Sequence, residues 1–509
     1  MVRGVAVATT EEEAVRAPGL LAPRLIRRSI PAALAALMAS AAVALAASSV
    51  ASRPSPFAAC TAGQSEGPPP GQVFVNAEVE QWIDVNPTDG TNVIGVWQQD
   101  RWTDGGAHGL DTAYSTNGGT SWSYPTPIPW STCAGSDEER FNRATDPWLS
   151  FGPTWIAHAV ALSIDANGFT AAILTSRSAD GGATWSDPVV VSDTNDFRIF
   201  DDKESLTADP TDPDLVYAVW DRIRKPGESK GTASQFNSFA FRGYPFFARS
   251  TDGGLTWETP RRMSGNANLF TIGNQIVVLP DGTLVDFADY ATGSGVQPSV
   301  HDWKAVFIST DKGDTWPAKP ITISKVFEVR HRIPDGSFPV RAGGDDIAVD
   351  PSSGDLYAVW TDGRFGDGTY NDIVLSKSTD GGQSWTSPLK VSQNPAGIDA
   401  HTPSVRVNDD GDVAVSYYDY RNDNDDASDG VETDFWFQVS SDGGATWSQT
   451  RLTPTSFDIT TAPVAPASRG YFLGDYEGLS SFGSTFHNLF VVTTGSLSNR
   501  TDVMFRTVP

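Results

Sequence analysis

The same eight-residue phrase occurs six times in this chain, and it constrains the fold more than any other feature of the sequence. Its consensus is S-x-[DN]-x-G-x-[ST]-W, and the copies start at residues 115, 178, 250, 309, 378 and 440. The intervals between them are 63, 72, 59, 69 and 62 residues, so a fixed motif alternates with loops of variable length. This pattern indicates one structural unit repeated along the chain.

The sequence around each copy is typical of β-strands. Before the phrase comes a run rich in branched and aromatic residues, such as LVYAVWDR at 215–222, and a shorter strand with a turn precedes that run. After the phrase another strand follows, such as PVVVS at 188–192. Each unit therefore consists of four expected antiparallel strands, and units of this length predict the blades of a β-propeller.

The number of units sets the expected number of blades. We find seven second strands, of which the last is FHNLFVVTT at 486–494, and predict an all-β propeller with seven four-stranded blades and six as the alternative. The last unit has no fourth strand of its own, and QVFVN at 72–76 is free to supply it, which would remove an exposed sheet edge. A stacked solenoid is less favoured because it would need capping ends.

The N-terminal region divides into two expected segments before the propeller at 72–509. Residues 1–47 are expected to be a signal peptide, because an alanine-rich apolar run follows Arg28 and ends in an Ala-x-Ala site at Ala44–Ala46. A retained membrane anchor is the alternative, since the run approaches the length that spans a bilayer. Residues 48–71 are expected to be a flexible linker.

Composition limits the partners and the compartment. The chain has 62 acidic and 36 basic residues and a formal net charge of −26, which argues against binding to nucleic acid or anionic lipid. Its two cysteines, Cys60 and Cys133, are predicted to form one disulfide in an oxidising compartment, with two unrelated thiols as the alternative. We expect a secreted monomer that does not insert into a membrane once the signal peptide is removed.

The repeated phrase resembles the Asp box, or BNR repeat, of the sialidase superfamily, and its six copies cover nearly all of the chain after residue 71. The resemblance implies a sialidase-like propeller that acts on or binds glycans or glycoproteins. In that family, an exo-glycosidase holds an anionic sugar with three arginines and uses a tyrosine nucleophile with a carboxylate acid/base. It implies no required cofactor.

The repeated aspartates themselves are expected to be structural. A carboxylate at this position can accept hydrogen bonds from turn amides, the glycines allow positive φ, and the tryptophan packs between sheets. The first copy has Asn117 instead, which can accept the same bonds but cannot act as an acid. The family's active site also uses the opposite face, so we do not expect catalysis from Asp180, Asp252, Asp311, Asp380 or Asp442.

Polar residues at the starts of the first strands are the better candidates. In a closed propeller they would crowd the mouth of the central channel, where neighbouring carboxylates repel one another unless cations or protons compensate. This ring could be a calcium site, a pair of acid/base carboxylates or a hydrated polar plug. Its members are Gln81, Asp146, Glu204, Gln275, Asp345 and Asp475, with His401 nearby. We select Glu204, Asp345 and Asp475 as catalytic candidates and Asp146 and His401 as substrate-binding candidates.

Two further features each occur in only one of the units. HRIPDG at 331–336 is similar to the Arg-Ile-Pro element of sialidases, whose arginine binds the substrate carboxylate, although in that family it opens the propeller. This resemblance assigns Arg332 to the substrate, with Arg198 and Arg222 as its partners. GDYEGL at 474–479 supplies Tyr476 as the candidate nucleophile, but the adjacent glutamate would point to the other face of a strand.

Other charged features have competing interpretations. Aspartate and arginine recur together after four of the second strands. These Asp–Arg pairs are expected to fix the loops rather than bind an anionic sugar. They are Asp100–Arg101, Asp221–Arg222, Asp362/Arg364 and Asp419/Arg421. The acidic loop RNDNDDASDG at 421–430 could bind Ca²⁺ through Asp423, Asp425 and Asp426, but it lacks the EF-hand pattern. The long segment 222–247 is expected to be an insertion on the functional face.

Two other functions stay open beside an exo-glycosidase that resembles sialidases. One is a non-catalytic propeller that binds a glycan or a protein on the same face. The other is a hydrolase of neutral glycans, for which two carboxylates would be enough.

Overall fold

The structure is a computed structural model that describes residues 48–67, 69–167, 170–224, 242–266, 269–292, 302–424, 430–464 and 470–509. Within these ranges the chain forms β-strands and short 3-10 helices, with no α-helix; the 3-10 helices are η1 (Thr132–Ala134), η4 (Gly363–Phe365) and η5 (Ile459–Thr461). The expected signal peptide, or retained anchor, at 1–47 lies outside the described ranges. Among the described residues, no helix has the length and the hydropathy needed to cross a membrane.

The strands form seven consecutive groups, each of which begins with a first strand that pairs with the second. The first three groups are β2 (Val73–Val85), β3 (Val93–Trp102) and β4 (Ala107–Ser115); β5 (Arg143–Phe151), β6 (Ala157–Ile164), β7 (Ala171–Ser178) and β8 (Val189–Thr194); and β9 (Ile199–Ala208), β10 (Val216–Arg224), β11 (Arg242–Ser250) and β12 (Arg261–Arg262). The first two groups share one sheet through a single pair, Ala107 with Ala144.

The remaining groups have the same antiparallel order. They are β13 (Leu269–Val278), β14 (Leu284–Thr292), β15 (Asp302–Ser309) and β16 (Ile321–Lys325); β18 (Asp345–Val349), β19 (Leu356–Asp362), β20 (Asp372–Ser378) and β21 (Leu389–Lys390); β22 (Ala400–Val407), β23 (Val413–Asp419), β24 (Glu432–Ser440) and β25 (Ser448–Arg451); and β28 (Gly478–Phe482), β29 (Thr485–Ser496), β30 (Asn499–Val508) and β1 (Ser48–Val50). In addition, β26 (Phe457–Asp458) pairs with β24, and β17 (Val340–Arg341) pairs in parallel with β27 (Tyr471–Phe472).

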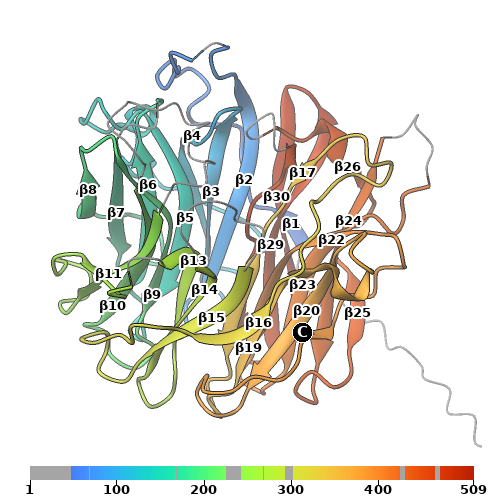
Figure 1. The fold of residues 1–509 in the computed structure, drawn as a ribbon. Coiled ribbons are helices and arrows are strands. Elements are labelled where there is room, and N and C mark those ends of the chain that lie inside the picture. Colours follow the sequence, from blue (N-terminus) through green and yellow to red (C-terminus); the bar gives the residue numbers. More distant parts are fainter. Residues whose placement is uncertain are drawn as a thin grey trace, which may run out of the picture. The chain divides into compact units, whose positions relative to one another are not determined.

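The first strands of the groups contact one another in chain order and return to the start. β2 contacts β5, and the series continues through β9, β13, β18, β22 and β28, which contacts β2 again. In Figure 1 the N-terminal strand β2 accordingly lies beside the C-terminal strands β29 and β30. This order is the one that an all-β propeller requires, and it supports the predicted seven blades.

Apolar side chains fill the space between neighbouring groups. Ile94 of β3 and Leu149 of β5 belong to one buried cluster between the first and second groups. Between the sixth and seventh groups, the rings of Phe435 and Phe490 stack with their centroids 4.4 Å apart. Each such side chain contributes about 1.5–3 kcal/mol when it is fully buried. The core is therefore distributed among the interfaces between sheets.

The closing strand differs from the predicted one. Residues 72–76 lie at the start of β2, where Val73 pairs with Trp102 of β3, so they do not complete the last group. Ser48–Val50 does so instead, with Ser49 opposite Phe505 of β30. The prediction was wrong because a strand of three residues carries no recognisable pattern.

The segment 48–71 also differs from the expected flexible linker. β1 lies in it, and Arg53 makes an ion pair with Asp111 of β4 at 2.9 Å. The predicted disulfide is confirmed: Cys60 is bonded to Cys133, with a Cα–Cα distance of 5.7 Å. This segment is thus fixed to the first strand group at several points.

The repeated phrase forms the same hydrogen-bonded turn each time. In the second copy, Asp180 accepts hydrogen bonds from Ser178 Oγ and from the Thr184 amide, both at 2.9 Å. In the first copy, the Asn117 side chain accepts the equivalent bond from the Ser121 amide at 3.0 Å. The glycine at the fifth position of each phrase has positive φ, and a Cβ at Gly119 would lie 1.9 Å from the ring of Phe505 in β30. The phrase therefore anchors each group to its neighbour, as expected.

A backbone irregularity recurs where the first strands begin. The register shifts in β2, β5, β9, β13 and β22, and one residue at each shift lies in the left-handed region of backbone space. Gly344 and Gly474, which precede β18 and β28, also have positive φ. The left-handed residues at the shifts are Glu80, Asp146, Lys203, Gly273 and Thr402, and β2 has an earlier shift with a further one, Asn76.

Candidate functional site

Three charged residues occupy the left-handed positions in the first three strand groups. Glu80, Asp146 and Lys203 have φ of 52°, 49° and 54°, where glycine is the favoured residue. A side chain in this conformation costs about 1–2 kcal/mol. Strained residues of this kind tend to occur at binding and catalytic sites. Their side chains are therefore candidates for a functional role.

These three side chains meet at one point. The Lys203 ammonium lies 3.4 Å from Glu80 Oε1, 2.9 Å from Asp146 Oδ1 and 2.7 Å from Asp475 Oδ2. Asp475 follows Gly474 and also binds Arg341 of β17, whose Nε and Nη2 groups donate to its two oxygens. We call Lys203, Glu80, Asp146, Asp475 and Arg341 the Lys203 cluster.

The cluster shifts the pKa values of its members in different directions. Burial raises the pKa of Glu80 to about 7, together with the neighbouring charge of Asp146, although Lys203 opposes the shift. Burial also acts against a charge on Asp475, but Arg341 and Lys203 outweigh it and hold the pKa of Asp475 far below its usual range. For Lys203, burial is outweighed by Asp146, Asp475 and Glu80, so its pKa is raised well above the ordinary value.

Lys203, Asp146, Asp475 and Arg341 of the Lys203 cluster line a cavity of about 680 Å³. Trp148 and Tyr476 supply an aromatic surface beside it, and their ring centroids are 5.5 Å apart. Trp82 stacks on Trp148 with a centroid distance of 3.4 Å. A cavity of this size, with aromatic side chains and a few fixed polar groups, is typical of small-ligand sites. No residue of the repeated phrases lines it.

Glu204 lines the same cavity in a very different environment from Asp475. Its side chain is only 3% exposed, and no other residue of the described ranges donates a hydrogen bond to either carboxyl oxygen. Burial, reinforced by the charge of Asp146, raises the pKa of Glu204 well above its ordinary value. The two environments therefore act in opposite directions: burial favours the protonated form of Glu204, whereas Arg341 and Lys203 favour the ionised form of Asp475.

A second lysine lies between carboxylates on another part of the wall. Lys304 Nζ is 2.8 Å from Asp345 Oδ2 and 2.5 Å from Asp289 Oδ1, and both aspartates line the cavity. Burial raises the pKa of Asp345 to about 7, although Lys304 acts in the opposite direction. The sequence pattern predicted Asp345 at the channel mouth, but it gave no indication of Lys304.

His331 lines the cavity with both ring nitrogens engaged. Its Nδ1 lies 2.5 Å from Asp399 and its Nε2 lies 3.2 Å from Glu328. Burial acts against a charge on the ring, but Asp399 and Glu328 outweigh it and raise the pKa of His331 to about 10. His331 is thus a fixed cation at neutral pH.

Tyr476 lies in the cavity wall, and its neighbour in sequence points elsewhere. The Tyr476 hydroxyl donates to the Pro147 carbonyl at 3.3 Å, and burial raises its pKa well above the ordinary value, so the phenol is neutral. Glu477 is fully buried and accepts a hydrogen bond from Gln81. The two adjacent side chains thus have different surroundings, although both residues precede β28 and do not lie in a strand as the sequence predicted.

The three arginines expected to bind an anionic sugar do not converge. Arg198 is 45% exposed and binds Asp196, Arg222 binds Asp201, and Arg332 is exposed and donates to the Gly336 carbonyl. None of them lines the cavity, so the structure does not bring them together there. Their positions depend on loops that carry no repeated pattern. Arg341 is the arginine that reaches the site, and its short strand β17 was not recognised in the sequence.

The expected substrate-binding role of His401 does not fit its position either. His401 is 1% exposed, its Nε2 lies 3.0 Å from the Tyr420 hydroxyl, and its ring stacks on Tyr418. Burial and the nearby charge of His331 lower its pKa well below the ordinary value. It does not line the cavity.

The proposed calcium loop is only partly described. Asp425 and Asp426 lie outside the described residues, whereas Asp423 accepts a hydrogen bond from the Glu432 amide at 3.2 Å. Across the ranges that the structure describes, no group of three histidine, cysteine or acidic side chains is arranged to hold a metal ion. The expected insertion at 222–247 also falls largely outside them, since 225–241 are not described.

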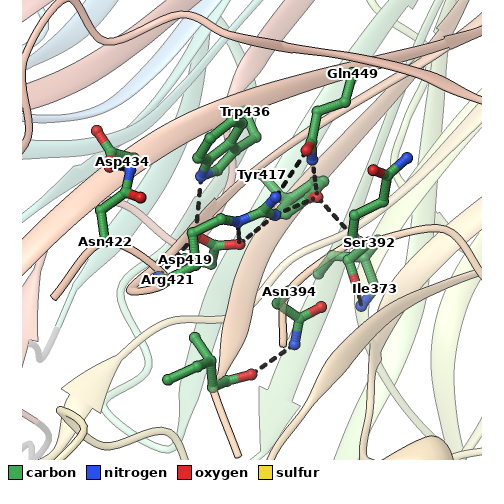
Figure 2. Close-up of polar contacts among 12 residues, drawn as sticks. Ile373, Ser392, Asn394, Tyr417, Asp419, Arg421, Asn422, Asp434, Trp436 and Gln449 are labelled. Carbon is green, nitrogen blue, oxygen red and sulfur yellow. Dashed lines mark hydrogen bonds and ion pairs between the residues drawn. The ribbon is translucent and has the colours of Figure 1, made fainter. Parts of the chain in front are cut away.

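Recurring Asp–Arg pairs form loop supports in two of the four expected cases. Figure 2 shows Asp419 with Arg421, where the guanidinium also reaches Tyr417 and Gln449 and the Trp436 indole donates to the aspartate at 2.9 Å. Asp362 binds Arg364 in the same way at 2.8 Å. By contrast, Asp221 binds Thr271, Gly273 and Asn274, and Asp100 binds Ser55, Asn76 and His108.

Comparisons with known proteins find similarity only at the level of structure. No family model and no curated protein matches the chain. A Hadza microbial sialidase is 14% identical with a TM-score of 0.46, and the match covers 86% of this chain and 92% of that one. An α-L-arabinofuranosidase from Fusarium graminearum is 15% identical over 67% of this chain and 88% of that one, with a TM-score of 0.44. An α-L-arabinanase from Penicillium chrysogenum is 11% identical over 86% and 98%, with a TM-score of 0.43. The function proposed for this chain therefore rests on its own site.

Proposed function

We propose that this protein hydrolyses glycosidic bonds, with the sugar bound in the cavity that Glu204 and Asp475 line. The supporting observation is that two carboxyl groups on one cavity have opposite environments, one buried without a partner and one held by two cations. Glycoside hydrolases use a pair of carboxyl groups in which one is protonated and the other is ionised.

The two groups would act in sequence. Glu204 donates its proton to the glycosidic oxygen as the bond from that oxygen to the sugar carbon breaks. The ionised Asp475 stabilises the positive charge that develops on the sugar ring, and Arg341 and Lys203 keep it in place. Water then adds to the sugar carbon, and the proton that it releases restores Glu204.

The compartment is a separate part of the proposal. A disulfide persists in oxidising surroundings, so the Cys60–Cys133 bond supports secretion and an encounter with glycans or glycoproteins outside the cell. We further propose that the secreted protein is a monomer from which the signal peptide has been cleaved.

A second candidate function is glycan binding without hydrolysis. This function is favoured because both carboxylate oxygens of Asp475 already accept hydrogen bonds from Arg341 and Lys203. In that case the cavity would retain a sugar and would release no product.

Release of a chromophore from aryl glycosides tests the proposal. The panel should include arabinofuranosides, hexopyranosides and sialosides, and the Glu204→Gln variant is expected to lose about 10²–10⁴-fold in kcat. The loss should be far smaller with a 2,4-dinitrophenyl leaving group, which needs no proton, and wild-type activity should fall at alkaline pH as Glu204 loses its proton.

Glu139→Gln is the matched control, because Glu139 is an exposed glutamate that does not line the cavity. Hydrolysis of no glycoside by the wild-type protein, with retained sugar binding, would favour the second function. A fully active Glu204→Gln variant would refute the assigned acid.

A further inference from the structure

We propose that the sugar unit taken by this cavity is uncharged, and that the ion pairs in its wall exclude sugars that carry a carboxylate. This inference rests on the proposed function and adds the substrate class to it. It is derived from the cations of the cavity and the partners that each of them already has.

Lys203 has no hydrogen-bonding capacity left for an anionic ligand. An ammonium group has three N–H donors. Lys203 has three carboxylate partners, Glu80, Asp146 and Asp475, at distances between 2.7 and 3.4 Å. A substrate carboxylate could bind Lys203 only by displacing one of them.

Arg341 is also committed. Its Nε and Nη2 groups face the two oxygens of Asp475, which is one of the arrangements in which a guanidinium binds a carboxylate through parallel hydrogen bonds. Its guanidinium carbon lies 4.8 Å from the centroid of the Phe472 ring. The charge of Arg341 is thus neutralised by Asp475 inside the protein.

The other cations of the cavity are paired in the same way. Lys304 is 5% exposed and lies between Asp289 and Asp345, and His331 lies between Asp399 and Glu328. Arg330 lines the cavity as well and is not free. Lys203, Arg341 and His331 are therefore each paired with carboxylates of the protein, and a substrate carboxylate could bind them only by displacing these partners.

The acidic side chains outnumber the basic ones along the cavity. Seven of its lining residues are aspartate or glutamate, and four are lysine, arginine or histidine. Carboxylates accept hydrogen bonds from hydroxyl groups, but they repel another carboxylate. The wall is thus suited to a neutral polyol such as an uncharged pyranose or furanose.

Binding of matched sugars to the Glu204→Gln variant tests the inference without turnover. Calorimetry would compare the methyl glycosides of galactose and glucose with those of galacturonate and glucuronate, and would add methyl arabinofuranoside and N-acetylneuraminate. We expect at least one neutral sugar to bind, and each acidic sugar to bind at least tenfold more weakly than its neutral counterpart.

The outcomes separate the inference from the proposed function. Binding of an acidic sugar that equals or exceeds that of its neutral counterpart would overturn the inference and leave glycan hydrolysis intact. If no sugar of either kind binds, the proposed function fails and the inference fails with it.

A charge-removing variant gives a second, independent measurement. Asp475→Asn takes one carboxylate from both Arg341 and Lys203, so affinity for galacturonate or N-acetylneuraminate should rise at least tenfold and should decrease again at high salt. Asp146→Asn, which releases Lys203 alone, should give a smaller gain and serves if the first variant does not fold.

Asp196→Asn is the matched control for this gain. It releases Arg198, which is exposed and lies outside the cavity, so it should leave sugar binding unchanged. If neither cavity variant gains affinity for an acidic sugar while both remain folded, the proposed role of the ion pairs is wrong.

Discussion

The repeated turns and the starts of the first strands both contain acidic residues, but the residues of the turns repeat from copy to copy and those of the strand starts do not. In the turns, aspartate accepts hydrogen bonds from its own loop, and the position repeats from copy to copy. At the strand starts, the left-handed position holds Glu80, Asp146 or Lys203 in three groups and glycine or threonine elsewhere. Positions that hold the same residue type in each copy therefore support the fold, whereas positions at which the groups differ indicate the cavity.

The largest expected difference between the two regions is in the stability that is lost when a lysine is replaced. Lys203→Met would leave Asp146, Asp475 and Glu80 without their shared cation, and breaking a buried ion pair in this way costs about 3–5 kcal/mol. Urea unfolding would measure the loss. The double variant Lys203→Met/Asp146→Asn should recover part of it, because one of the uncompensated charges is removed.

Lys312 provides the matched control in a repeated turn. It has one carboxylate partner, Asp209, and its side chain is 31% exposed. Lys312→Met should therefore lose only about 1 kcal/mol. Equal losses for the two lysines would contradict the contrast between the regions.

The pH dependence of stability should differ in sign between the regions. Glu80 has its pKa raised from 4.5 to about 7 in the folded protein, so the unfolded chain binds fewer protons between these values. Its contribution to stability is fully present below about pH 4.5 and is lost as the pH rises through 7, by up to roughly 3 kcal/mol. Unfolding of wild type and Glu80→Gln at pH 5 and pH 8 would isolate this effect.

Asp380 in a repeated turn should behave in the opposite way. Hydrogen bonds from the side chain and amide of Ser384 lower its pKa from 3.8 to about 2, so its contribution is present above about pH 4 and is lost as the pH falls through 2. Identical pH profiles for wild type and Glu80→Gln would show that Glu80 is not perturbed by the cluster.

The smallest expected difference is that between two adjacent glycines of one turn. Gly119→Ala would place a Cβ 1.9 Å from Phe505 at a φ of +80°, and we expect a loss of about 2–4 kcal/mol from the clash and the strained backbone. Gly118→Ala has a similar φ of +67° but no atom within 4 Å, so about 1 kcal/mol should be lost. A thermal denaturation comparison of the two variants would separate packing from backbone strain.

The sequence predicted the carboxylates of the cavity better than its cations. Asp146, Glu204, Asp345 and Asp475 could be placed because each lies at a roughly equivalent position in its repeated unit. Lys203 lies among acidic residues in FDDKES, which is also typical of a solvated charged loop. Its role depends on a left-handed backbone that directs the side chain inward, and no local pattern indicates that conformation.

The sequence did not indicate which arginine reaches the cavity, for a related reason. Arg332 was assigned from a three-residue resemblance, but the loop that follows it turns back on itself, and its guanidinium binds the Gly336 carbonyl. Arg341 reaches the cavity from a two-residue strand that pairs with β27, a contact between distant parts of the chain. Long-range pairing of this kind leaves no trace in local composition.

The closing strand has a consequence for the order of synthesis. Ser48 lies opposite Arg506, so nearly the whole chain must be made before the last sheet can be completed. Until then, β30 has an open edge that can pair with another chain. Contacts between such distant residues also form slowly. A truncation that begins at residue 72 would remove this strand and leave the edge open, so aggregation of the shortened protein during refolding is the expected consequence.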